Sequence, residues 1–134
     1  VRHRARRIVS RELIVVAAVQ WRFAGVDHVD AWFARARTAI ADAAARGAGL
    51  VVLPEYVGAE LLSAEAVMLT GDAAIDRSAA WQPVLDAFWR ELACAHGIAI
   101  VGGSQLTRDA GRLARNVCTV ALPDGSIHHR AKIH

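Results

Sequence analysis

Three short apolar runs, separated by two segments of helix length, constrain the fold of this chain more than any other feature. The runs span 13–19, 49–53 and 98–101, and they are continuous rather than alternating between apolar and polar residues. Continuous, β-branched runs of this length are typical of buried strands. Because a helix-length crossover joins parallel strands by a right-handed connection, the sequence predicts helices packed against a parallel sheet.

The first connecting segment, 27–46, has helical periodicity. Its apolar residues predict one buried face, made of Trp32, Ala36, Ile40 and Ala43. Asp27 and Asp30 favour the positive end of the helix dipole, and Gly47 follows as a stop signal.

The second connecting segment predicts a short helix over 59–69, a break at Gly71-Asp72 and a long helix over 78–96. Ser78 is the expected N-cap, and Pro83 is then acceptable because it falls near the first turn. The apolar side of the long helix is expected to comprise Trp81, Leu85, Phe88, Trp89 and Leu92.

Two further strands are predicted over 117–122 and 127–131, joined by a turn at 123–126. The expected order is therefore β-α-β-α-β followed by a hairpin, an α/β fold. A length of 134 residues without internal repeats fits one domain or a piece of a larger one.

Composition excludes several classes of protein. Hydrophobic residues make up 54% and charged residues 22%, so the chain has enough apolar material for a core and is not disordered. The longest apolar run, Leu13–Val19, is far shorter than the roughly 18 residues of a membrane span. Two cysteines do not form a disulfide framework, and no secretory signal is evident, so we expect a cytoplasmic protein.

The net charge of +3 is concentrated in the arm 1–12, which alone carries +4, so the rest of the chain sums to −1. The rest of the chain therefore offers no basic surface for binding nucleic acid. The arm is interpreted as a solvated terminus, and the alternative is that it binds nucleic acid as an adaptor. Of the 16 basic residues 15 are arginine, and Lys132 is the one lysine. Lysine supplies a compact point charge, so Lys132 is a candidate for a task that arginine does not perform.

Polar or flexible residues follow each of the three apolar runs. In parallel sheets, ligands bind just beyond the carboxyl ends of the strands, which is where these residues are expected to lie. The residues are Gln20-Trp21, Pro54-Glu55-Tyr56 and Gly102-Gly103-Ser104. Partial burial of Glu55 is expected to raise its pKa and suit it to act as a general base. The alternative is a strand-end carboxylate that reaches solvent.

Lys132 ends the last predicted strand and could stabilise an oxyanion as a fixed cation, or simply be a solvated edge-strand lysine. Cys118 and Cys94 are interpreted as small buried hydrophobes. The histidines lack zinc-ligand spacing, so no metal is expected. The glycines at 102–103 match no phosphate-binding motif and are expected to allow close backbone approach.

Together these segments resemble the carbon–nitrogen hydrolase (nitrilase) superfamily. The matching stretches are 16–20, 50–55, 98–104 and 115–134, in the order and with the gaps of that family. The resemblance implies part of a four-layer α-β-β-α sandwich, no cofactor, a small amide or nitrile substrate and a homo-oligomeric full-length protein. Tyr56, Gly103 and Ser104 become candidates for the substrate pocket.

The resemblance also implies a Glu–Lys–Cys triad, with Glu55 as general base and Lys132 as the cation that stabilises the tetrahedral intermediate. The family's nucleophilic cysteine follows the lysine by a further strand, and this chain ends two residues after Lys132. Residues 13–134 are thus expected to be the N-terminal portion of a hydrolase domain, inactive alone, with apolar sheet surface and open edges left uncovered.

A flavodoxin-like α/β binding domain without catalysis is the alternative. It predicts that Lys132 lies far from Glu55, whereas the hydrolase hypothesis requires both head groups to face one substrate position.

Overall fold

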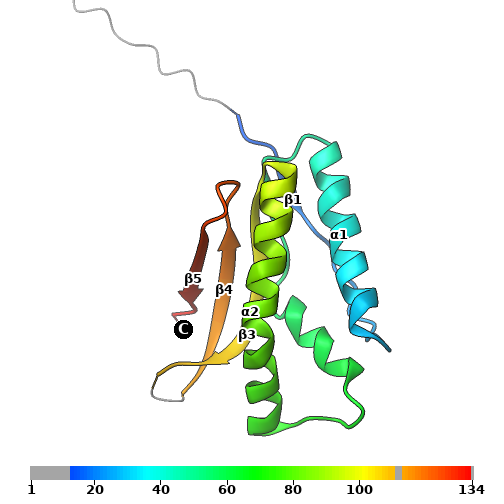
Figure 1. The fold of residues 1–134 in the computed structure, drawn as a ribbon, viewed down its shortest axis with the longest axis vertical. Helices are drawn as coiled ribbons and strands as arrows, with labels where there is room; N and C mark the ends of the chain where they lie inside the picture. The colour runs from blue at the N-terminus through cyan, green and yellow to red at the C-terminus, as the bar shows by residue number, and fades with distance from the viewer. Residues whose placement is uncertain (1–12, 111–112, 134) are drawn as a thin grey trace, which may run out of the picture.

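The computed structural model describes residues 13–110 and 113–133 (Figure 1). The basic arm predicted over 1–12 lies outside these residues. The elements in chain order are β1 (Val16–Ala18), α1 (Val29–Ala45), β2 (Leu50–Val52), the 3-10 helix η1 (Val57–Ala64), α2 (Gly71–His96), β3 (Ala99–Arg108), β4 (Ala114–Ala121) and β5 (Ile127–Ala131).

The strands form a single sheet in the order β1-β2-β3-β4-β5. β1, β2 and β3 are parallel, while β4 and β5 add to the edge as an antiparallel hairpin. The α/β fold and the β-α-β-α-β-plus-hairpin order expected from the sequence are confirmed.

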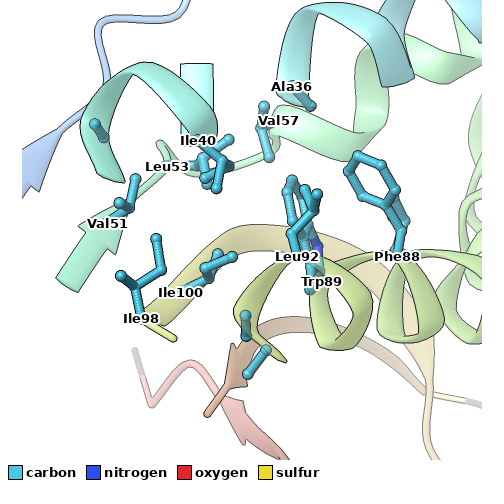
Figure 2. Close-up of a cluster of buried hydrophobic side chains, with 14 of the residues drawn as sticks. Ala36, Ile40, Val51, Leu53, Val57, Phe88, Trp89, Leu92, Ile98 and Ile100 are labelled. Atoms are coloured by element: carbon cyan, nitrogen blue, oxygen red, sulfur yellow. The ribbon is translucent and has the colours of Figure 1, made fainter. Parts of the chain in front are cut away.

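Both long helices pack on one face of the sheet (Figures 1 and 2). Register places Ala17, Val51, Ile100 and Ala121 in line across the sheet, and Val51, Ile100 and Ala121 are fully buried under the helices. Since strand side chains alternate, the residues between them face the other side. The core therefore occupies one side of the sheet only.

The predicted buried face of α1 is confirmed, because Trp32, Ala36, Ile40 and Ala43 are its buried residues. Trp32 packs against Phe88 and Trp89 of α2, with ring centroids 6.1 and 5.9 Å away. This aromatic packing joins the two helices above the sheet.

The predicted start of α2 is wrong. The helix begins at Gly71 with Thr70 as N-cap, so Ser78 lies buried within it and Gly71-Asp72 is its first turn. Pro83 consequently sits in the helix interior, with its side chain exposed. Tertiary packing on both sides of the proline, by Ser78 and by the apolar residues from Leu85 onward, outweighs the lost backbone hydrogen bond.

Two strand predictions also need correction. β1 is short and lies at the sheet edge, where Val15 and Val16 are 55% and 52% exposed rather than buried. β3 does not end at its glycines but continues to Arg108, with a register shift between Val101 and Ser104. Pairing with β4 extends β3, and a bulge at this point redirects the strand.

The face of the sheet opposite the helices has no covering layer among the described residues. Register aligns Ala18, Val52, Val101 and Val120 on this open face, and Val16 lies beside them on the edge strand. The expectation that apolar sheet surface is left uncovered agrees with this arrangement. The functional candidates described next lie on the same open face.

Candidate functional site

Glu55 and Lys132, the two residues singled out for catalysis, meet in the structure. Lys132 Nζ lies 2.9 Å from Glu55 Oε1, although 77 positions separate them in the sequence. Glu55 follows β2 after Pro54, and Lys132 follows β5 with its backbone N–H bonded to the carbonyl oxygen of Asn116 at 2.8 Å. The flavodoxin-like alternative predicted separation of these groups, which the distance contradicts.

Asn116 of β4 completes this pair and was not predicted as a site residue. Its Nδ2 donates to Glu55 Oε1 at 2.5 Å. Asparagine is depleted in strands, so its presence inside β4 was the one signal that could have identified it. The Glu55 carboxylate is thus bonded to the ammonium group of Lys132, directly after β5, and to the side-chain amide of Asn116 in β4.

The expected rise in the pKa of Glu55 is wrong. The hydrogen bond from Lys132 holds the pKa of Glu55 below its ordinary value, with further lowering by the charge of Lys132 and the Asn116 amide. The side chain of Glu55 is 48% exposed, so burial does not dominate. Glu55 in turn raises the pKa of Lys132, and both groups are charged at neutral pH.

Substitution of Lys132 by Met is expected to move the pKa of Glu55 up toward 4.5, its ordinary value, because the main stabiliser of the carboxylate is removed. Carboxyl ¹³C NMR titration measures this shift. Glu91, whose pKa is lowered by Arg37 elsewhere on the surface, is the internal control and should not move. An unchanged Glu55 pKa in Lys132→Met would contradict the observed pairing.

The same pKa direction sets a pH dependence of folding. Because Glu55 has a lower pKa in the folded chain than its ordinary 4.5, the pair stabilises the fold above about that pH. The contribution is lost as the pH falls through the folded pKa. Since both side chains are about half exposed, the effect on stability is small.

A groove of about 410 Å³ surrounds the pair, in the size range of small-ligand sites. It is lined by Glu55, Ser104, Asn116, Cys118, Arg130, Ala131 and Lys132. Glu55, Lys132 and Ser104 were predicted from the sequence as site residues, whereas Asn116, Arg130 and Ala131 were not, and Cys118 was interpreted as structural. These last four residues come from β4 and β5, whose pairing places Arg130 opposite Cys118.

Cys118 lacks the lowered pKa of an activated cysteine. Burial raises the pKa of the Cys118 thiol, which therefore stays protonated at neutral pH, although the residue lines the groove. Cys94 is exposed on α2, so its interpretation as a buried residue is wrong. It follows Ala93 on the helix and points away from the core.

Of the three residues predicted to line the substrate pocket, one lines the groove and two do not. Ser104 lines the groove, and its Oγ accepts the backbone N–H of Tyr56 at 3.3 Å. Gly103 and Tyr56 are not among the lining residues. Gly103 instead permits a close backbone contact, because a Cβ there would lie 2.3 Å from the carbonyl oxygen of Pro54.

Tyr56 has a left-handed backbone with a φ of 61°, which is uncommon for a residue other than glycine. It directly follows Glu55 and is the N-cap of η1. Strained conformations of this kind persist only where the surrounding structure holds them. Here the Ser104 hydroxyl and the contact of Gly103 with Pro54 hold the turn that carries Glu55.

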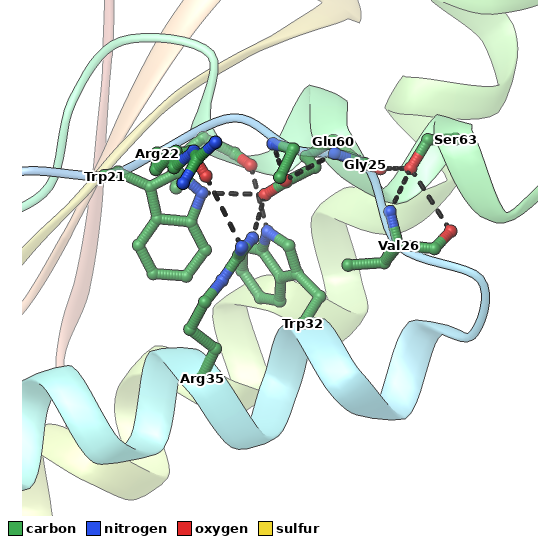
Figure 3. A network of polar contacts seen from close by, with 10 residues as sticks. Trp21, Arg22, Gly25, Val26, Trp32, Arg35, Glu60 and Ser63 are labelled. Carbon is green, nitrogen blue, oxygen red and sulfur yellow. Dashed lines mark hydrogen bonds and ion pairs between the residues drawn. The ribbon is translucent and has the colours of Figure 1, made fainter.

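A buried network around Glu60 anchors η1 on its other side (Figure 3). The Glu60 carboxylate accepts hydrogen bonds from Trp21 Nε1 at 2.7 Å and from the backbone N–H groups of Ala24 and Gly25. Arg35 of α1 forms an ion pair with it. Because its partners satisfy a charge that would be costly to bury alone, Glu60 ties the segment after β1 and α1 to η1.

The described residues contain no group of three or more histidine, cysteine or acidic side chains placed to hold a metal ion. Among the same residues, no helix has both the length and the apolar character needed to cross a bilayer.

Solved structures resemble this fold. A carbon–nitrogen hydrolase from Helicobacter pylori matches with a TM-score of 0.68 and 20% identity, over 90% of this chain and 40% of its own. A branch 10 nitrilase-superfamily member from Saccharomyces cerevisiae matches with 0.65 and 23%, over 90% and 44%. A CN-hydrolase superfamily protein from Xanthomonas campestris, with an arsenic adduct in its active site, matches with 0.57 and 22%, over 90% and 39%.

These matches confirm the nitrilase-like fold that the sequence resemblance implied. This chain spans about two fifths of the length of the solved structures that it matches. No protein-family model and no curated protein matches the sequence significantly.

Proposed function

We propose that this chain is the N-terminal part of a carbon–nitrogen hydrolase that cleaves a small amide or nitrile through a Glu–Lys–Cys thioester mechanism. The observation that carries the proposal is the contact of Glu55 with Lys132, 2.9 Å apart in a groove on the open face of a nitrilase-like sheet. A carboxylate and an ammonium so placed can act as a base and as an electrostatic stabiliser of the same reacting centre.

The proposed reaction on an amide begins when the Glu55 carboxylate takes the proton of a cysteine thiol. The thiolate attacks the carbonyl carbon, and Lys132 stabilises the negative charge that develops on the oxygen. The proton on Glu55 passes to the leaving nitrogen as the carbon–nitrogen bond breaks and a thioester forms. Water, deprotonated by Glu55, then hydrolyses the thioester to release the acid and restore the thiol.

The proposed mechanism takes its nucleophile from beyond residues 13–133, because neither described cysteine is placed to react with Glu55. The Cys118 thiol donates to the carbonyl oxygen of Thr119, whereas the side chain of Glu55 bonds to Asn116 and Lys132. Cys94 lies on α2, on the opposite face of the sheet.

We place the nucleophile after Lys132, on a strand of a second sheet that packs against the open apolar face. That face would otherwise expose Val16 and its neighbours to water. By this proposal the 134-residue chain is inactive by itself.

The experiment compares the 134-residue chain with a protein extended along its reading frame beyond His134. We expect ammonia release from a panel of small amides only with the extended protein, because only that protein holds the sulfur nucleophile. Hydroxylamine should trap the thioester as a hydroxamate, which mass spectrometry of the products detects.

Two outcomes would contradict the proposal. Amide hydrolysis by the purified, monomeric 134-residue chain would show that no further nucleophile is needed. An extended protein that folds but releases no ammonia or acid from any amide or nitrile would remove the assignment to this class of hydrolase.

A further inference from the structure

We propose that Arg130 forms a carboxylate-binding subsite in the groove, so that the substrate is an amide or nitrile that also carries a carboxylate. This inference rests on the proposed function, and it names the class of substrate for the same site. It follows from the position of Arg130 on β5 and from the balance of charges in the groove.

Arg130 and Lys132 lie on the same side of the β5 segment. Register places Arg130 opposite Cys118, and both residues line the groove together with Lys132. Residues two apart on one strand project to the same side, with about 7 Å between them. A ligand whose reacting carbon lies at Lys132 would reach Arg130 across a short aliphatic spacer.

No acidic side chain that lines the groove is available to neutralise the charge of Arg130. Lys132 pairs with Glu55, so these two charges balance. The one hydrogen bond that the structure gives Arg130 runs from Nη1 to the carbonyl oxygen of His129, and no ion pair within 13–110 and 113–133 includes Arg130. The remaining lining groups, including the protonated Cys118 thiol, are neutral, so the lining carries one excess positive charge.

An arginine fork suits a carboxylate better than a neutral group. The guanidinium is planar, stays charged at all relevant pH values and can bind both carboxylate oxygens at once. Arg37 and Arg77 on the surface have the acidic partners Glu91 and Glu65, whereas Arg90 bonds to the carbonyl oxygen of Gly125. The position of Arg130 in the groove is therefore what distinguishes it. An arginine that serves only to protect a sheet edge does not need to line the groove that holds Glu55 and Lys132.

A binding measurement tests the subsite without requiring turnover. Calorimetry or NMR titration of the extended protein compares glutarate with pentane-1,5-diol, a neutral molecule of the same chain length. We expect glutarate to bind more tightly, and Arg130→Gln to weaken it by about 5- to 10-fold, between the effects of buried and exposed charge-assisted pairs. Arg46→Gln, which removes an exposed charge from the C-cap of α1, is the control and should have no effect.

A second experiment measures turnover of two paired substrates, glutaramate and the neutral glutaramide. Arg130→Gln should raise KM for glutaramate by about the same 5- to 10-fold and leave glutaramide unchanged, and Arg130→Lys should restore part of the preference. The inference is overturned if Arg130→Gln and Arg46→Gln behave alike, or if inorganic phosphate binds more tightly than glutarate. Loss of all turnover with glutarate binding intact would count against the proposed function and not against the subsite.

Discussion

Replacement of Glu55 by Gln is expected to lower kcat/KM for amide hydrolysis by the extended protein by about 10²- to 10⁴-fold, the usual contribution of a general base. The glutamine keeps the size of the side chain and can still accept a hydrogen bond from Lys132, but it cannot take the thiol proton. Because the Glu55–Lys132 pair is about half exposed, we expect the melting temperature to change little. Steady-state ammonia release and thermal unfolding measure the two effects.

Glu91→Gln is the matched control, because it removes a surface carboxylate whose Oε1 is paired with Arg37 at 2.8 Å, remote from the groove. Its activity should equal that of the unmodified protein. If Glu55→Gln retained activity within a few-fold of the control, Glu55 would not be the base. A binding domain without catalysis would show no turnover in either protein.

Replacement of Gly103 by Ala is expected to lower the free energy of unfolding by about 2–5 kcal/mol. The φ of Gly103 is +73°, and an added Cβ would lie 2.3 Å from the carbonyl oxygen of Pro54 and 2.6 Å from Val57 Cγ1. Both the left-handed conformation and the overlap with neighbouring backbone oppose alanine. The displaced segment, Pro54 to Val57, carries Glu55.

Gly47→Ala separates the conformational cost of alanine at a positive φ from the cost of steric overlap. Gly47 also has a positive φ, +82°, but a Cβ there meets nothing within 4 Å. This variant should therefore lose only the conformational part, about 1–2 kcal/mol. Urea denaturation of both variants measures the difference, and equal losses would show that the contact between β3 and Pro54 is not tight.

The sequence determined the parts of this protein that depend on one segment at a time. Helical spacing identified the buried face of α1 from Trp32 to Ala43, because a single helix sorts its own residues between core and solvent. Apolar runs and crossover lengths likewise predicted the order of the elements along the chain and the parallel direction of the first three strands. Glu55 and Lys132 stood out because each lies at the end of a predicted strand, and because the chain has one lysine.

The tertiary structure alone decided what depends on several segments together. Asn116 and Arg130 enter the site through pairing of β4 with β3 and β5, and no local pattern records that register. The low pKa of Glu55 arises from a lysine 77 positions away, whereas its sequence neighbours indicated burial and the opposite shift. Local periodicity reflects how one segment partitions from water, while register, charge pairing and the open face arise only when distant segments pack against one another.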